Sequence, residues 1–391
     1  MALAIGTGSL DITPPAGLDI AGNLWATAST GTRDPLRCKA LVLDDGEARA
    51  ALVAIDVIGL ERPEVLRARE LIEARTGIHA ERVMLACSHT HQGPATLRYA
   101  ATAWPAGYME VLPRLIADAV TAAAREMSPV TWAYARAEQG TVGHYRRAKL
   151  DSGRVRNTWL LTPDAPVVGP AGEIDPALPL LAFRGEDSWR ALVANFACHA
   201  TCAGDGRWSA NYPGYFAAGV AKRLGIDGDR VFYTSGAAAN TNPRVPDAAA
   251  FGAQLAEVVP PALASPEWRP GARLRGRERA VTLPPRKVDR FPFDQIAEAY
   301  GPSFGQLNFG RVVKYYADEY VKLVERGPVP IETALQVLAL DDVALVGIPG
   351  ELFVELGREI QRRSPFARTL IVTMANDWVG SVSYTHLTLP T

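Results

Sequence analysis

The sequence predicts an α/β fold, in the form of a single compact layered domain with mixed β-sheets flanked by helices. Three observations lead to this prediction. Apolar residues make up 48% of the 391 residues, which is enough for a sizeable core. Strand-like and helix-like segments alternate, and some strand-like segments are separated only by short turns, so parallel and antiparallel pairing should occur together. No linker-like stretch divides the chain.

Turn residues between short apolar runs mark two β-hairpins. Asp44-Asp45-Gly46 separates runs at 40–43 and 50–55, and Asp341-Asp342 interrupts the alternating run 337–348. Further strands are expected at 82–87, 179–184, 190–197, 230–234 and 368–374. Helices are expected where apolar residues recur at helical spacing, at 62–75, 108–126, 213–224, 246–258 and 352–362. Residues 11–17 read as loop, residues 139–175 as a polar, glycine-rich stretch, and residues 259–330 receive no clear assignment.

Composition and charge exclude several classes of function. Lys and Arg total 41 and Asp and Glu total 42, so the formal net charge of -1 gives no electrostatic reason to expect nucleic acid as a partner. No window has the roughly 20 apolar residues of a transmembrane helix, and the N-terminal residues lack the regions of a leader peptide. The expected location of the chain as given is cytoplasmic, with secretion left open. The four cysteines are expected to be reduced thiols. The sequence sets no oligomeric state.

Histidine is scarce, and three of the six histidines stand where a predicted strand meets a loop. They are His89, His91 and His199. Because alternate residues of a strand point to the same face, His89 and His91 can both face one cleft. A His-x-His pair at a strand end, with a remote histidine and a carboxylate, is a common arrangement for catalytic zinc. The alternative for the pair is two hydrogen-bonded structural histidines.

Six short segments follow the motif order of one known family. Two contain histidines, Ser88-His-Thr-His-Gln-Gly-Pro94 and Asn195-Phe-Ala-Cys-His-Ala-Thr201. The other four are Asp11-Ile-Thr-Pro-Pro-Ala-Gly17, Arg33-Asp-Pro-Leu-Arg-Cys-Lys-Ala-Leu-Val-Leu43, Gly236-Ala-Ala-Ala-Asn-Thr-Asn-Pro243 and Ile348-Pro-Gly-Glu351. Together they resemble the catalytic domain of neutral/alkaline ceramidases, in which Thr-His-Thr-His-Ser-Gly-Pro and Ala-Val-His-Pro-Thr segments supply zinc-binding histidines. Each motif alone is weak, but six in order are specific, and the resemblance extends to Gly380.

The resemblance implies a site for one zinc ion per chain. Its ligands would be His89, His199 and Glu351, and His91 would line the site and help to orient substrate or water. From the residues alone, Glu351 has a second interpretation. It can be a carboxylate that interacts favourably with the N-terminus of the helix expected at 352–362.

Two further positions concern the substrate. Arg146, or its neighbour Arg147, matches a family arginine near the substrate, where a guanidinium suits an oxyanion or a polar head group. The alternative is a solvated surface pair. Asn242 stands where characterised ceramidases have a serine implicated in amide cleavage. Asparagine cannot act as that nucleophile, but it can position substrate or donate to an oxyanion. The expected catalytic residues are therefore His91, Arg146 and Asn242.

Other catalytic arrangements are not supported by the sequence. Cys198 and Cys202 flank His199, but C-x-x-x-C around one histidine is a poor structural zinc pattern, so both are interpreted as buried thiols. Ser209 and Ser235 lack the G-x-S-x-G context of a serine hydrolase. Neither a Walker motif nor a dinucleotide-binding fingerprint occurs.

The end of the chain departs from the family pattern. The family has a zinc-associated tyrosine in a segment that resembles Asn-x-Tyr-x-x-Tyr, and the matching position here is Ser381, with Tyr384 out of register. Residues 1–380 are therefore expected to be a C-terminally truncated catalytic domain, and residues 381–391 a non-native tail.

These expectations lead to a zinc-dependent hydrolase that cleaves amide bonds in N-acylated substrates, either ceramide-like sphingolipids or smaller amides. Such an enzyme would belong to sphingolipid or other lipid metabolism. One alternative is a non-catalytic relative with a dormant metal site, which the absent serine and tyrosine favour. Another is a zinc hydrolase that acts on an ester or a lactone.

Overall fold

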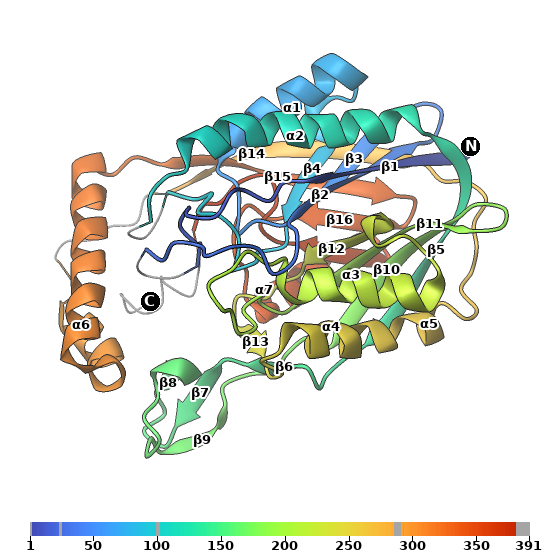
Figure 1. Cartoon of the computed structure of the whole chain (residues 1–391). Coiled ribbons are helices and arrows are strands. Elements are labelled where there is room, and N and C mark those ends of the chain that lie inside the picture. The colour runs from blue at the N-terminus through green and yellow to red at the C-terminus, as the bar shows by residue number, and fades with distance from the viewer. Residues whose placement is uncertain (1, 23–25, 99–101, 285–290, 292, 381–391) are drawn as a thin grey trace.

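A mixed eight-stranded β-sheet forms the centre of the domain (Figure 1). The computed structural model describes residues 2–22, 26–98, 102–284, 291 and 293–380. The strand order is β12-β11-β10-β5-β1-β2-β3-β4. Its strands are β1 (Leu3–Asp11), β2 (Arg37–Asp44), β3 (Arg49–Ile55), β4 (Val83–Cys87), β5 (Ser128–Glu138), β10 (Ala177–Arg184), β11 (Trp189–Phe196) and β12 (Val231–Ser235). The outermost strand pairs of this sheet, β3 with β4 and β11 with β12, are parallel. The pairs between them are antiparallel.

A second, four-stranded sheet packs on one face of the first. Its order is β14-β15-β16-β17, and its strands are β14 (Leu274–Leu283), β15 (Ile331–Leu340), β16 (Val343–Gly347) and β17 (Arg368–Val372). Leucines and valines of both sheets form one buried cluster between them. The two edge strands of the large sheet, β12 and β4, also approach each other. The strands that precede the candidate histidines therefore end in the same region of the molecule.

Helices cover the other face of the large sheet. In Figure 1, α1 (Arg62–Thr76) and α2 (Ala106–Arg125) lie along the top of the molecule. The helices α3 (Asn211–Leu224), α4 (Ala248–Glu257) and α5 (Val259–Ala262) lie along its lower side. Each group of helices buries its own apolar cluster against the sheet. The layers are thus helices, large sheet and small sheet.

Residues 40–43 of β2 show why the centre of this strand is apolar without interruption. Ala40 and Val42 belong to the cluster under α1 and α2, whereas Leu41 and Leu43 belong to the cluster between the sheets. Successive side chains of a strand point to opposite faces, so a strand that is covered on both faces needs apolar residues at every position.

Two elements project from this layered body in Figure 1. One is an arm built from β7 (Arg147–Leu150), β8 (Val155–Asn157) and β9 (Val167–Pro170), which includes the short helix η2 (Thr158–Leu160). The other is the long helix α6 (Phe293–Arg326). The arm joins the body beside the pair β6 (Gly143–Tyr145) and β13 (Thr241–Pro243). The remaining elements are η1 (Ala80–Arg82), η3 (Gly228–Arg230) and α7 (Val354–Arg363).

The predicted fold class is confirmed, since one layered α/β domain with mixed sheets contains the described residues. Both predicted hairpins exist, as β2–β3 and β15–β16. The loop expected at 11–17 follows directly on β1, a strand that received no assignment from the sequence, and β14 and α6 were left unassigned within 259–330. Residues 381–391, interpreted as a non-native tail, lie outside the described residues.

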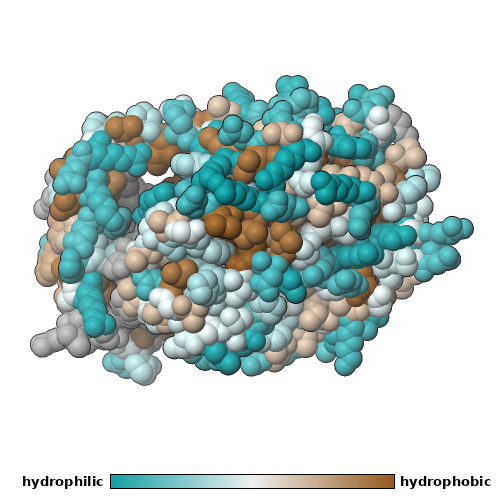
Figure 2. All heavy atoms as spheres, turned by 45° about the horizontal axis from the view of Figure 1, so that its top comes forward, coloured by the Kyte–Doolittle hydropathy of each residue, from teal (hydrophilic) through white to brown (hydrophobic). Residues whose placement is uncertain are grey.

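The surface carries no unusually apolar face in the view of Figure 2. Hydrophilic side chains cover most of this face and surround a compact hydrophobic patch near its centre. Single exposed apolar residues and small patches are ordinary for folded domains. Among the described residues, no helix has the length and apolar character needed to cross a membrane.

The helix α2 packs closely on β1, and a substitution at Gly8 can test this contact. A Cβ atom built on Gly8 would lie 2.3 Å from the carbonyl oxygen of Ala119 in α2, a distance that requires the helix to move. We expect Gly8→Ala to lower the free energy of unfolding by about 3 kcal/mol, the upper range for overpacking. Chemical denaturation measures this loss.

Gly107 provides the matched control, because it lies in α2 with open space around it. Gly107→Ala is expected to change stability by less than about 1 kcal/mol, in the stabilising direction. Equal stability of the Gly8→Ala protein and the parent would contradict the close packing of α2 on β1.

Candidate metal centre

The candidate site lies where strands of both sheets end. His89 follows β4, His199 follows β11 in the large sheet, and Glu351 follows β16 in the small sheet. The packing of the two sheets and the approach of the outer strands bring these strand ends together. The site is therefore assembled by the fold from segments far apart in the sequence.

The backbone at His89 is in the left-handed region, with φ of 60°. His89 lies in the loop beyond β4, so the alternation of strand residues is not what directs His89 and His91 to the same place, and that reasoning was wrong. The conformation is held by hydrogen bonds from the His89 amide to the Val57 carbonyl and from the His91 amide to the Ala200 carbonyl. A left-handed non-glycine residue costs about 1–3 kcal/mol, and such residues cluster at functional sites.

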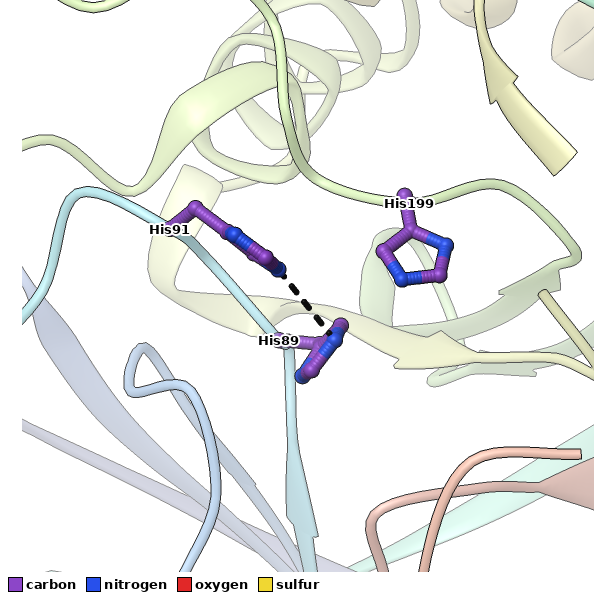
Figure 3. Close-up of side chains that lie close together, drawn as sticks. All are labelled: His89, His91 and His199. Atoms are coloured by element: carbon purple, nitrogen blue, oxygen red, sulfur yellow. Dashed lines mark hydrogen bonds between the residues drawn. The ribbon is translucent and has the colours of Figure 1, made fainter. Parts of the chain in front are cut away.

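The three imidazoles face one another (Figure 3). The Nε2 atoms of His89 and His91 are 3.3 Å apart. The ring centroid of His199 lies 5.0 Å from that of His89 and 5.8 Å from that of His91. One potential ligand atom from each ring can be chosen so that all lie within 4.8 Å, so this group could hold a metal ion.

Glu351 completes the cluster from the small sheet. Its Oε2 lies 3.1 Å from Nε2 of His199, and its Oε1 lies 3.8 Å from Nε2 of His89. The side chain is 8% exposed. Because α7 begins only at Val354, the carboxylate lies before the helix and is turned toward the imidazoles. The interpretation of Glu351 as a helix-terminus carboxylate does not account for this direction.

Backbone carbonyls orient two of the rings. Nδ1 of His89 is 2.8 Å from the Ile58 oxygen, and Nδ1 of His199 is 2.7 Å from the Ala238 oxygen. A carbonyl only accepts hydrogen bonds, so Nδ1 carries the proton in both rings. In the neutral imidazoles the Nε2 lone pairs are then directed into the cluster, as they are when histidine binds a metal.

Burial and nearby charge shift the ionisation of the cluster. Burial, followed by the charge of Arg146, lowers the pKa of His199 to about 4. Burial and the neighbouring imidazoles lower the pKa of His91 well below its ordinary value. Burial opposes ionisation of Glu351, but the adjacent histidines and Arg146 outweigh it and lower the pKa of that carboxyl. The arrangement thus favours an ionised Glu351 and neutral imidazoles at His91 and His199. Carboxylate oxygens and neutral imidazole nitrogens suit a divalent cation.

Arg146 and Asn242 lie beside the histidines. Nη1 of Arg146 donates a hydrogen bond to Oδ1 of Asn242 at 3.3 Å and lies 3.4 Å from Nε2 of His199. The guanidinium also stacks on Trp159, with Cζ 4.9 Å from the ring centroid. Arg147 instead lies over the ring of Phe353, so Arg146 is the arginine of this cluster. All six residues expected from the sequence therefore lie together.

The sequence interpretation missed the residues that support Arg146. Trp159 belongs to the arm, whose polar and glycine-rich sequence gave no signal for a site. Asn240 is fully buried, and its carbonyl accepts a hydrogen bond from the Arg146 amide. Its side-chain amide donates to Glu355 at 2.7 Å and to the Tyr145 hydroxyl at 3.1 Å. The position of Asn240 inside the segment 236–243 was the one available signal.

The cysteines near His199 take no part in the described cluster. Cys198 and Cys202 are buried and carry free thiols, as expected. Burial raises the pKa of Cys202 to about 12, so the thiol stays protonated. The group of side chains that could hold a metal ion in the described part of the chain includes neither cysteine.

The fold and the histidine cluster define a layered two-sheet α/β domain with a potential metal centre at its strand ends. This is the fold of neutral ceramidases. The structure of neutral ceramidase from Pseudomonas aeruginosa superposes with a TM-score of 0.74 at 17% identity, over 97% of this chain and 68% of that chain. A ceramidase complexed with C2 superposes with a TM-score of 0.72 at 16% identity, over 97% and 69% of the two chains.

Sequence comparison adds nothing to this likeness, since no family model and no curated protein matches the chain. At 16–17% identity, structural likeness establishes the fold. The resemblance inferred from the six motifs is thereby confirmed as that of a neutral-ceramidase-like domain.

Asn240 gives a test of the support behind Arg146. Its side chain also accepts a hydrogen bond from the Val354 amide at 3.0 Å. Asn240→Ala would leave the buried Val354 amide without this partner and remove the bonds to Glu355 and Tyr145, and we expect a loss of about 3 kcal/mol in the free energy of unfolding. Tyr145→Phe removes only the bonds of one hydroxyl and should cost about 1 kcal/mol. Urea denaturation of the two variants measures the difference, and equal costs would contradict a central role for Asn240.

Proposed function

We propose that this chain is a zinc-dependent hydrolase of amide bonds in N-acylated substrates. The observation that carries the proposal is the convergence of His89, His199 and Glu351, from three strand ends, on one buried point beside His91 and Arg146. Buried polar groups of this kind are costly unless they bind something or one another. The neutral ceramidase structures, which share the fold, support the choice of amide hydrolysis.

The zinc ligands in this proposal are His89, His199 and Glu351. Glu351 approaches both histidines, whereas the His91 ring is farther from His199 than the His89 ring is. Two imidazole nitrogens and one carboxylate oxygen form a usual protein donor set for catalytic zinc. Zinc bound there would supply Lewis acidity that polarises an amide carbonyl and activates water for attack.

The surrounding side chains have separate tasks in this mechanism. The Arg146 guanidinium, held between Asn242 and Trp159, donates hydrogen bonds to the oxygen that becomes negative as the carbonyl is attacked. The Nε2 of His91 accepts a hydrogen bond from the attacking water. This bond orients the water, and Nε2 then takes up its proton. The proton is then delivered to the departing amine.

Asn242 limits the substrate that we assign. Its side chain has no nucleophilic atom, so it holds Arg146 and presents an amide group to the substrate. We therefore assign smaller N-acyl amides as better substrates than ceramide. Hydrolysis of a soluble N-acyl amide that stops on chelation and returns with zinc would support this assignment. Chelator-sensitive hydrolysis of esters or lactones alone would replace it, and zinc-free protein without turnover would indicate a dormant relative.

Metal retention is the direct test of the ligand set. We expect purified protein to contain about one zinc ion per chain, and His199→Ala to lose it, because removal of one of three ligands leaves an incomplete site. His79→Ala is the control, since the His79 side chain is 67% exposed and bonded to Glu73 far from the cluster. Elemental analysis of both variants decides the matter, and full zinc content in His199→Ala would refute the ligand set.

Position 242 tests the substrate assignment. We expect weak hydrolysis of ceramide by the parent protein and an increase of about tenfold or more in Asn242→Ser, which introduces a hydroxyl nucleophile. Asn242→Ala removes the same amide without adding a hydroxyl and should show no gain. Product formation from ceramide is followed by chromatography. Efficient ceramide hydrolysis by the parent would contradict the assignment.

A further inference from the structure

A cleft separates the arm from the body of the domain. It has a volume of about 730 Å³ and is bounded by β6, β7, β9 and α7. Figure 1 shows the arm projecting below β6 and β13, with this junction at its base. None of the six residues of the candidate metal centre lines the cleft. The cleft is therefore separate from the proposed catalytic cluster.

Three guanidinium groups from different segments line the cleft. Arg147 comes from β7, Arg244 from the chain after β13, and Arg358 from α7. Two carboxylates are near. Both oxygens of Glu355 are engaged, by the Tyr145 hydroxyl and the Asn240 amide.

The other carboxylate, Glu173, does not neutralise the cleft. Its side chain is 88% exposed and lies 3.9 Å from Arg358, a long contact at the rim. Surface ion pairs of this kind contribute little. Burial, and then the positive charge of Arg244, lowers the pKa of His144, which lines the same cleft. The interior thus presents more positive than negative charge.

The remaining walls are apolar. Val167 and Ile174 line the cleft together with prolines of the arm and the following loop, and Val167 is 48% exposed. Gly172 brings the backbone close to the body, because a Cβ atom there would lie 2.7 Å from the Tyr145 ring and 2.9 Å from Glu355 Oε1. Cationic groups beside apolar walls suit a ligand that is charged at one end and apolar at the other.

We propose that this cleft binds an amphipathic carboxylate, with the carboxylate on the arginines and the alkyl chain along Val167 and Ile174. Arginine is the side chain best matched to a carboxylate, through two parallel hydrogen bonds. The cleft is physically linked to the candidate metal centre, because β6 carries His144 and Tyr145 and leads directly to Arg146. His144 is also paired with Asn242 across the β6–β13 ladder. Binding requires no turnover, so the proposal stands apart from the proposed function.

Calorimetric titration with decanoate tests this binding. We expect saturable binding of decanoate, little binding of acetate and none of decyltrimethylammonium, which has the same chain with the opposite charge. Affinity should rise about threefold for each methylene between hexanoate and decanoate, as apolar burial requires. Binding of acetate as tight as that of decanoate, or binding of the cationic amphiphile, would overturn the proposal.

Substitutions locate the site. The double variant Arg244→Gln/Arg358→Gln should bind decanoate at least about tenfold more weakly, because charge-assisted bonds are lost. Arg362→Gln is the control on the same helix, with a side chain 70% exposed and paired with Glu359. The single variant Arg244→Gln keeps the bond from Arg358 to the Ile174 carbonyl, so it serves as the test if the double variant fails to fold. It should lose part of the affinity for decanoate.

His199→Ala separates this cleft from the metal centre, to which a carboxylate could also bind. Decanoate binding should survive in His199→Ala. Loss of binding in that variant, or unchanged binding in the arginine variants, would place the ligand elsewhere and overturn the proposal.

Discussion

The buried carboxylate of Glu351, placed between the imidazoles of His89 and His199, is the interaction on which the rest of the site depends. An ionised group so far from solvent is tolerated only when partners compensate for its lost hydration. Its partners come from the large sheet, whereas Glu351 itself comes from the small sheet. The geometry of the site therefore depends on how the two sheets pack against each other. The sheets must pack in a fixed register for the carboxylate to meet both rings.

A polar clamp near the site fixes that register. Asn376 accepts a hydrogen bond from the Leu85 amide in β4 and donates one to Gln336 in β15, each at 2.8 Å. Gln336 also donates to the Val83 carbonyl at the start of β4. The strand that precedes His89 is thus held to the small sheet. Asn376 has a φ of 65°, a left-handed backbone conformation like that of His89.

The sequence was informative where local chemistry determines structure. Asp-rich turns marked both hairpins, and the motifs identified five of the six residues that the fold brings together. The sixth, Arg146, came from a separate match that left Arg147 as an alternative. The sequence was not informative where a contact between distant segments determines the local conformation. The edge strand β14 is rich in arginine and pairs on one side only, so its composition resembles that of a loop. The left-handed backbone at His89 depends on carbonyls of the 57–58 and 200 segments, which no local pattern reveals.

The arm and α6, which sequence patterns describe least well, are connected to Arg146 of the candidate site. Trp159 of η2 covers the Arg146 guanidinium and is 43% exposed, so one part of its ring remains open beside the candidate site. The next residue, Leu160, is buried with Ile296, Val312 and Tyr316 of α6. The arm and α6 are thereby joined through two consecutive residues to the side chain proposed to stabilise the oxyanion. The proposed metal ligands are positioned by the packing of two sheets. Changes in that packing would disturb the fold itself. The arm and the helix lie outside those sheets, so they can change shape without disturbing the ligands. For the function proposed above, the core would therefore hold the groups of the reaction, and the elements that project from it would select the substrate.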